Sequence, residues 1–547
     1  MPPGAKRTLQ SNILPSCTFP CEKVCEACLD IVALDNKVAG LRQALVELEA
    51  ERFELLSKVN HGHDTITNRL PMEVFSTILK LSLPMPDTLG NKTPRLELLG
   101  PLVFSAVSRR WKDIVCSTPS LWTVVPVCTT AIRFHPIVED LMEEWICRSG
   151  QKLLSIIINL DNYHLTPPQF IPRIISECSY RLEYLRMEGK FSMVKSLDFS
   201  NLGAQSISTL ALAITGSDLT YHPAPQLKLG DGLRPTTLEL EYISWRQLGV
   251  HADRLTHAHL SWLPTVDCMN LLACAPMMTE FSVYGFKGDN AELASSILHQ
   301  GLGSLRIECG ASRICSILDS LNVPSLLHLE LRLWQFSIAA NLEVSSRVLL
   351  DRVTNCLQRS SASLESLCIQ DLPLNPSDDA YSSLGRLMNT TGPSIRHLTI
   401  KVAQAGHLQW DLPESPQQLI DSIFHEERRL PHLKSITVNG FPEIWLHCFK
   451  ALLLSISHFI SSNGARPILL VMPFLANPLN TDYHKDVPPD VYRDGTLQLP
   501  GAEIGEMLSL SKELDITIKM PITAYQREQD DVFPDVLDAL TRLSLEE

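Results

Sequence analysis

Four cysteines near the amino terminus, Cys17, Cys21, Cys25 and Cys28, have the residue type and spacing that come closest to a chemical site. Four thiolates can hold zinc in tetrahedral coordination. Only Cys25 and Cys28 have the two-residue spacing of a zinc knuckle, and the long gap that usually separates two knuckles is missing. We therefore expect free thiols on a disordered tail, residues 1–30, with no metal and no cofactor.

The other patterns that could support catalysis are incomplete. Gly230 and Gly232 lack the third glycine of a phosphate-binding loop, and His425-Glu426-Glu427 lacks the second histidine of a zinc-protease helix. The sequence contains no Gly-x-Ser-x-Gly motif of the kind that carries a nucleophilic serine. We therefore expect a chain that is not an enzyme and has no catalytic residues.

The composition favours a globular protein that binds neither nucleic acid nor membranes. The chain has 547 residues, of which 45% are hydrophobic and 20% charged, and its net charge is −14. That acidity argues against broad binding to nucleic acid or to anionic lipid. The 15 cysteines are mostly scattered singly through apolar segments, which is typical of reduced thiols in the cytosol or nucleus. We expect no signal peptide and no membrane span.

A heptad pattern covers residues 31–60. Leucine recurs every seven residues at one seam position, and apolar residues occupy the other seam position except at Arg52. The pattern predicts a long amphipathic helix, ending where Asn60 to Asp64 interrupt it. The apolar stripe could join two copies in a coiled coil, so a homodimer is possible. It could equally fold back on the domain that follows. The seam positions are Ile31, Leu34, Val38, Leu41, Leu45, Leu48, Leu55 and Val59.

Residues 66–125 predict a small helical domain with more apolar surface than its own core needs. Pro71 suits the first turn of a helix, and Glu73 complements the helix dipole there. Val74 and Ile78, and likewise Phe75 and Leu79, are spaced four residues apart. Two apolar stripes therefore run along one short helix, where a single core would need only one. A partner protein would cover the second stripe, although a bundle buried against the rest of the chain is the simpler alternative.

The same segment resembles the F-box, and in particular the F-box-like proteins of mushroom-forming fungi. The resemblance rests on Leu70-Pro71-x-Glu73-Val74, on Val107-Ser-Arg-Arg-Trp111 and on the ending Thr118-Pro-Ser-Leu-Trp122. It implies three helices that dock on a Skp-type linker protein, and through it on a cullin. The residues that would form or support this face are Leu70, Pro71, Val74, Ile78, Val107, Trp111, Leu121 and Trp122. The insert at residues 84–100 departs from a minimal F-box.

A shorter pattern, Leu-x-x-Leu-x-Leu, recurs between residues 150 and 445. Most copies are separated by roughly 20 to 30 residues, with longer gaps near the C-terminal end, which is the range of a leucine-rich repeat with insertions. Each copy predicts a strand, with helical stretches such as residues 269–275 and 345–359 between them. An ordinary α/β domain with similar strands is the alternative. The copies lie at residues 182–187, 207–212, 238–240, 255–260, 278–283, 302–307, 326–331, 364–369, 395–400 and 433–438.

The pattern resembles the leucine-rich-repeat class of F-box proteins, whose stacked units share one core. The variable positions of each strand would then lie on one concave face. Candidates for that face are Arg186, Glu239, His259, Glu330, Gln370 and Lys401. The last hundred residues do not match the repeat and predict a cap. That cap would have helices at residues 449–460 and 535–545, strands at 468–472 and 515–519, and a loop at 483–496.

The sequence therefore predicts a mixed α and α/β chain. It consists of a tail (1–30), a coiled-coil helix (31–60), a three-helix F-box-like domain (66–125), a leucine-rich-repeat-like α/β solenoid (126–445) and a C-terminal α/β cap (446–547). The resemblance implies a substrate-recognition subunit of an SCF-type ubiquitin ligase, located in the cytoplasm or nucleus, which captures an unidentified protein for ubiquitin-dependent degradation. The alternative is a scaffold or coiled-coil interaction protein without a ligase role.

Overall fold

The computed structural model describes two compact units. Unit 1 consists of Met1–Trp122 with Cys147–Gly150, and unit 2 of Thr123–Ile146 with Gln151–Glu547. The described residues are 26–63, 67, 69–83, 100–128, 135–160, 170–197, 207–215, 227, 229, 232–287, 296–334, 344–373, 379–402, 422–423, 430–439 and the short strands after residue 467 that are given below.

Helix α1, Glu26–His63, is longer than the heptad pattern predicted. It begins five residues before Ile31 and includes Asn60, which was expected to interrupt it. A single glycine inside a helix costs only about 1 kcal/mol, so Gly62 does not end it. Every seam residue of the heptads is exposed. None is therefore packed against the described part of the bundle that follows.

The described residues in the rest of unit 1 form three helices and a 3-10 turn. They are α3, Met72–Leu81; α4, Gly100–Ser105; α5, Arg109–Ser117; and η3, Pro119–Leu121. Pro71 is the N-cap of α3 rather than a residue of its first turn. The side chain of Ser108 caps α5 by accepting a hydrogen bond from the backbone N–H of Trp111 at 3.2 Å. The buried apolar core is formed by Phe75, Leu79, Ile114, Val115, Leu121 and Trp122.

Unit 2 is built on one parallel sheet whose strands follow one another in chain order. Among the described residues the sheet has 14 strands, and each pairs in parallel with its neighbours. The first twelve are β1 Val124–Cys128, β2 Leu154–Asn159, β3 Leu182–Lys190, β4 Thr209–Thr215, β5 Thr237–Glu241, β6 His257–Leu263, β7 Glu280–Phe286, β9 Ser304–Cys309, β11 His328–Leu333, β12 Ser366–Leu372, β13 His397–Val402 and β14 Ser435–Asn439.

Each copy of the Leu-x-x-Leu-x-Leu pattern overlaps one of these strands, from β3 to β14. Its leucines point to a single buried face. In β11, for example, Leu329 and Leu331 are buried, while Glu330 between them and Arg332 after them are only partly buried. The first leucine of a copy, such as Leu326, is buried just before its strand begins. The leucine pattern therefore identifies the face of each strand that is buried in the core.

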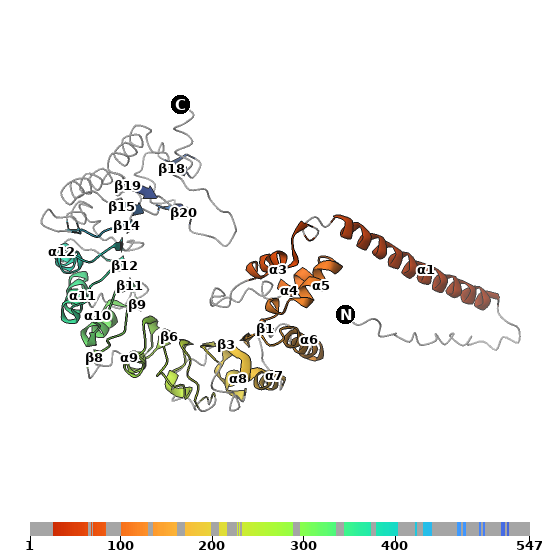
Figure 1. Cartoon of the computed structure of the whole chain (residues 1–547), viewed down its shortest axis with the longest axis horizontal. Coiled ribbons are helices and arrows are strands. Elements are labelled where there is room, and N and C mark those ends of the chain that lie inside the picture. Colours follow the sequence, from red (N-terminus) through yellow and green to blue (C-terminus); the bar gives the residue numbers. More distant parts are fainter. Residues whose placement is uncertain are drawn as a thin grey trace. The chain divides into compact units, whose positions relative to one another are not determined.

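The buried face of the sheet is covered by helices that connect successive strands. Figure 1 shows α9 to α12 along one side of the strands, and α10 packs on α11 as α11 does on α12. Helix α11 agrees closely with the predicted segment 345–359. The helices are α6 His135–Arg148, α7 Phe170–Cys178, α8 Phe191–Ser196, α9 Thr265–Cys274, α10 Ala311–Ser320, α11 Ser346–Ser360 and α12 Ala380–Thr391; the 3-10 turns are η5 Ser179–Arg181 and η6 Trp245–Gln247; a small parallel pair is β8 Ile297–Leu298 with β10 Leu321–Asn322.

The C-terminal strands continue the same sheet. Strands β15, Ile468–Val471, and β19, Ile516–Lys519, pair in parallel after β14. The segment predicted as a loop contains β17, Tyr492–Arg493, paired antiparallel with β18, Thr496–Leu497. Strands β16, Phe474–Ala476, and β20, Ile522–Ala524, form a further parallel pair. The helices predicted at 449–460 and 535–545 lie outside the described residues. None of the described helices is both long and apolar enough to cross a membrane.

Candidate interaction surfaces

The residues predicted to dock a linker protein fall into two groups. Pro71, Val74, Ile78 and Val107 are exposed, and the side chains of Val74 and Ile78 keep 45% and 47% of their accessible surface. Leu70 and Trp111 are partly buried, and Trp111 packs edge-on against Phe75 with ring centroids 4.7 Å apart. The first group leaves apolar surface exposed, whereas Trp111 helps to hold α3 against α5.

Leu121 and Trp122, which were predicted to form or support the docking face, are both buried. The indole N–H of Trp122 donates to the carbonyl oxygen of Val115 at 2.8 Å, which ties the end of the domain to α5. The guanidinium of Arg148 lies over the same ring, 4.6 Å from its centroid. These two residues can support a docking face from the core of unit 1, but cannot contact a partner.

The open face of the sheet in unit 2 carries its polar residues in rows, because the parallel strands pair in register. Arg186, Glu239, His259 and Glu330, predicted to share a face, lie in one such row. Gln370 and Lys401 lie one row nearer the carboxyl ends of the strands. The first row passes strand by strand through Arg186, Ala211, Glu239, His259, Ser282, Arg306, Glu330, Cys368, Thr399 and Thr437.

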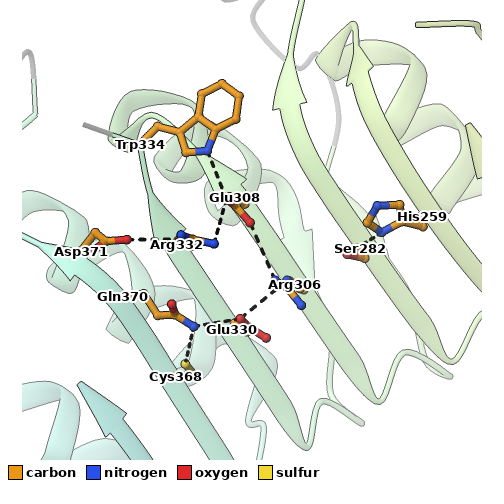
Figure 2. A network of polar contacts seen from close by, with 10 residues as sticks. All are labelled: His259, Ser282, Arg306, Glu308, Glu330, Arg332, Trp334, Cys368, Gln370 and Asp371. Carbon is orange, nitrogen blue, oxygen red and sulfur yellow. Dashed lines mark hydrogen bonds and ion pairs between the residues drawn. The ribbon is translucent and has the colours of Figure 1, made fainter. Parts of the chain in front are cut away.

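A network of ion pairs connects these rows from β9 to β12, with Glu308 at its centre (Figure 2). Oxygen Oε1 of Glu308 lies 3.3 Å from a guanidinium nitrogen of Arg332, and Oε2 lies 3.8 Å from Arg306. The indole N–H of Trp334 donates to Oε1 of Glu308 at 3.2 Å. Asp371 accepts a hydrogen bond from Nε of Arg332 at 3.3 Å. Carboxylates therefore hold the guanidinium groups of Arg306 and Arg332 in place.

The network extends on both sides of this centre. Nε of Arg306 lies 3.6 Å from Oε1 of Glu330, and the amide of Gln370 donates to the same oxygen at 3.1 Å. Nζ of Lys401 lies 3.1 Å from Oδ1 of Asp371. Glu308 keeps only 7% of its side-chain surface exposed, whereas Arg332 keeps 41%. The side chains of Arg306 and Arg332 are thus much more exposed than that of Glu308.

Four aromatic rings cluster beside this network, at the carboxyl ends of β5, β6, β7 and β11. Tyr242 stacks on Trp262 with centroids 5.7 Å apart and planes nearly parallel. Trp334 lies 4.7 Å from Trp262 and 5.0 Å from Tyr284, measured between ring centroids. All four are only partly buried. Together they form a semi-exposed patch, called the aromatic cluster below.

The backbone is strained beneath two members of the aromatic cluster. Tyr242 and Trp262 have φ angles of 60° and 59°, in the left-handed region that aromatic residues rarely adopt. Such a conformation costs on the order of 1–3 kcal/mol and is common at binding sites. The sequence signal was present, since an aromatic residue follows the last apolar position of several copies within three residues, but aromatic residues in strands usually belong to a core.

His259 lies in the first polar row, with Nδ1 3.1 Å from the hydroxyl of Ser282. Partial burial, followed by the positive charge of Arg306, lowers the pKa of His259 below its ordinary value of 6.5. The neutral ring therefore acts as a hydrogen-bonding group on this surface at neutral pH rather than as a third cation beside the arginines.

Among the described residues, no three His, Cys, Asp or Glu side chains come together as metal ligands. Burial raises the pKa of the thiol of Cys309 to about 12 and that of Cys315 to about 11, so both are poor nucleophiles. Cys17, Cys21, Cys25 and the segment His425-Glu426-Glu427 lie outside the described residues, as do the side chain of Cys28 and Gly230.

The chain therefore presents two surfaces of different character. One is the exposed apolar side of α3 with the turn after α4, and the other is the polar and aromatic face of the sheet. No protein-family model, curated protein or solved structure matches the chain.

Proposed function

We propose that this chain is a substrate-recognition subunit of an SCF-type ubiquitin ligase. In this account α3 to α5 form an F-box-like domain that docks on a Skp-type linker, and the sheet of unit 2 is a leucine-rich-repeat-like domain that binds a target protein. The chain itself makes and breaks no covalent bond. It raises the effective concentration of the target's lysines near a charged conjugating enzyme.

The observation that carries the docking proposal is the exposed apolar side of α3. Phe75 and Leu79 already fill the core of unit 1, so the neighbouring stripe of Val74 and Ile78 is left facing outward. Val103 and Val107, in α4 and the turn after it, are also exposed. Several large apolar residues exposed on so small a bundle favour a protein partner.

The proposal that the sheet binds a target is supported by its composition. Tryptophan, tyrosine and arginine are the residue types that contribute most to protein interfaces. The aromatic cluster lies beside Arg306 and Arg332, which are held by carboxylates before any partner arrives. Side chains that are already ordered lose less entropy on binding, so this surface suits a protein ligand.

The docking proposal is tested by co-expressing the full chain with a Skp-type linker. The double variant Val74→Asp with Ile78→Asp places two charges on the apolar side of α3 without touching its core. If each residue contributes about 1–2 kcal/mol, linker affinity falls by more than about tenfold. The matched control, Val266→Asp with Val348→Asp, changes two similarly exposed valines in α9 and α11. Equal linker binding by both double variants would overturn the docking proposal.

A further inference from the structure

Helix α1 is 38 residues long, about 57 Å at 1.5 Å per residue. Its apolar seam is uncovered along its whole length in the described structure. The exposed fraction of the seam side chains runs from 36% at Val38 to 64% at Leu41. A stripe of large apolar residues this long is unusual on the surface of a monomer, and so implies an occupant.

The seam is separate from the side of α1 that meets the bundle. The guanidinium of Arg109, in α5, lies 5.2 Å from the centroid of the Phe53 ring. Phe53 is one position beyond the seam residue Arg52 in the heptad, so this contact leaves the seam free for another helix. The opposite side of α1 is polar or small, with Asn36, Gln43, Ala50 and Ser57 every seven residues.

The residue types along the seam indicate the occupant. One seam position is leucine in every heptad, at Leu34, Leu41, Leu48 and Leu55. The other is β-branched in three of its five positions, at Ile31, Val38 and Val59, and holds Leu45 and Arg52 in the remaining two. This combination favours pairs of helices over larger bundles. Two copies of α1 can therefore fill each other's seams layer by layer, with no segment from a different protein.

We propose that a second copy of this chain occupies the seam, so that the protein is a homodimer joined by a two-stranded coiled coil of α1. Arg52 is the one polar residue in the seam. A single polar residue at such a position fixes the register of the pair and weakens it. The dimer carries two target-binding sheets and two docking domains, so a target with two binding segments is held more tightly than by one copy.

Sedimentation equilibrium of the full chain tests this proposal without reference to linker or target. The proposal predicts a concentration-dependent shift from 61.1 kDa to twice that mass. Leu41→Asp with Leu48→Asp weakens dimerisation by more than about a hundredfold, because it buries charge in two layers of the seam. The matched control, Gln43→Asp with Ala50→Asp, introduces the same residues on the polar side of α1 and leaves the dimer intact.

Arg52→Leu supplies a test that misfolding cannot imitate, since it tightens the dimer by about tenfold or more. A wild-type chain that stays monomeric at all concentrations would overturn the proposal. A dimer that survives Leu41→Asp with Leu48→Asp, or is equally lost in the control, would also overturn it. Loss of linker binding by the α3 variants bears on the proposed function alone, because those residues lie outside the seam.

Discussion

Gly285 lies directly against the ring of Trp334. A β-carbon on Gly285 would stand 3.0 Å from Cη2 of Trp334, and 3.1 Å from two ring atoms of Trp262. Gly285 also has a φ of 63°, which side-chain-bearing residues rarely adopt. The absence of a side chain at this position is therefore what allows two indoles, one from β6 and one from the residue after β11, to meet over β7.

Gly285→Ala is expected to lower the free energy of unfolding by about 2–3 kcal/mol, because it adds a steric clash to the cost of a left-handed alanine. Gly249→Ala separates the two effects, since Gly249 has a φ of 66° with nothing within 4 Å of its added β-carbon. It should cost only about 1 kcal/mol. Urea denaturation measures both. Equal losses would show that the indoles do not constrain Gly285.

Glu308→Gln is expected to lower the free energy of unfolding by about 1–2 kcal/mol. Removing one partner of a buried ion pair typically costs about 3–5 kcal/mol, but the exposure of Arg306 and Arg332 reduces the effect. Glu280→Gln is the control, because Glu280 is exposed and its carboxylate lies 3.8 Å from Nε2 of His257 rather than between two arginines. It should change stability by less than about 0.5 kcal/mol. A neutral Glu308→Gln would mean that the ion-pair network contributes nothing.

The pKa of His259 should lie below 6.5, because burial and Arg306 disfavour its charged form. Between the lowered pKa of His259 in the folded chain and its ordinary value of 6.5, the unfolded chain binds more protons than the folded one. The free energy of unfolding therefore rises with pH in this range. Acidification below 6.5 therefore weakens the fold, and His259→Gln should reduce that sensitivity.

Titration of selectively labelled histidine by NMR checks this pKa directly. Arg306→Gln should raise the pKa of His259. Arg396 pairs with Glu365 instead, so Arg396→Gln should leave the pKa of His259 unchanged. A wild-type pKa at or above 6.5 would contradict the account.

The described thiols should differ sharply in reactivity. Cys147 and Cys274 are exposed, whereas Cys268, Cys309 and Cys356 are buried, with their pKa values raised by burial. Iodoacetamide should modify the two exposed cysteines first in the native protein. It should modify the three buried cysteines only after unfolding. Peptide mass spectrometry reads each position separately. Rapid native modification of Cys268 would show that α9 does not pack on the sheet as described.

The strands could be predicted from the sequence because their burial repeats. The leucines of each Leu-x-x-Leu-x-Leu copy mark the covered face, so the copy at residues 326–331 located β11 to within two residues. The order of the strands in the sheet could not be predicted from burial alone. Whether successive strands pair with one another or with distant ones depends on how the helices between them pack, and local sequence does not specify that.

The two surfaces differed in how far they could be predicted. The exposure of Val74 and Ile78 could be predicted because helical spacing separates two apolar stripes, whereas the burial of Trp122 could not. Its indole N–H has a partner in the core, the carbonyl of Val115, which no sequence pattern reveals. The aromatic cluster was missed because it joins residues as far apart as Tyr242 and Trp334, and depends on left-handed backbone at Tyr242 and Trp262.

Membership of a ligase is the central claim, and cullin recruitment tests it most directly. The full tagged chain should be purified with its linker and the complex weighed by native mass spectrometry in the presence of cullin. The account predicts one complex that contains chain, linker and cullin, and that is lost with Val74→Asp and Ile78→Asp. A chain that binds the linker but excludes the cullin would contradict the ligase claim and leave a scaffold in its place.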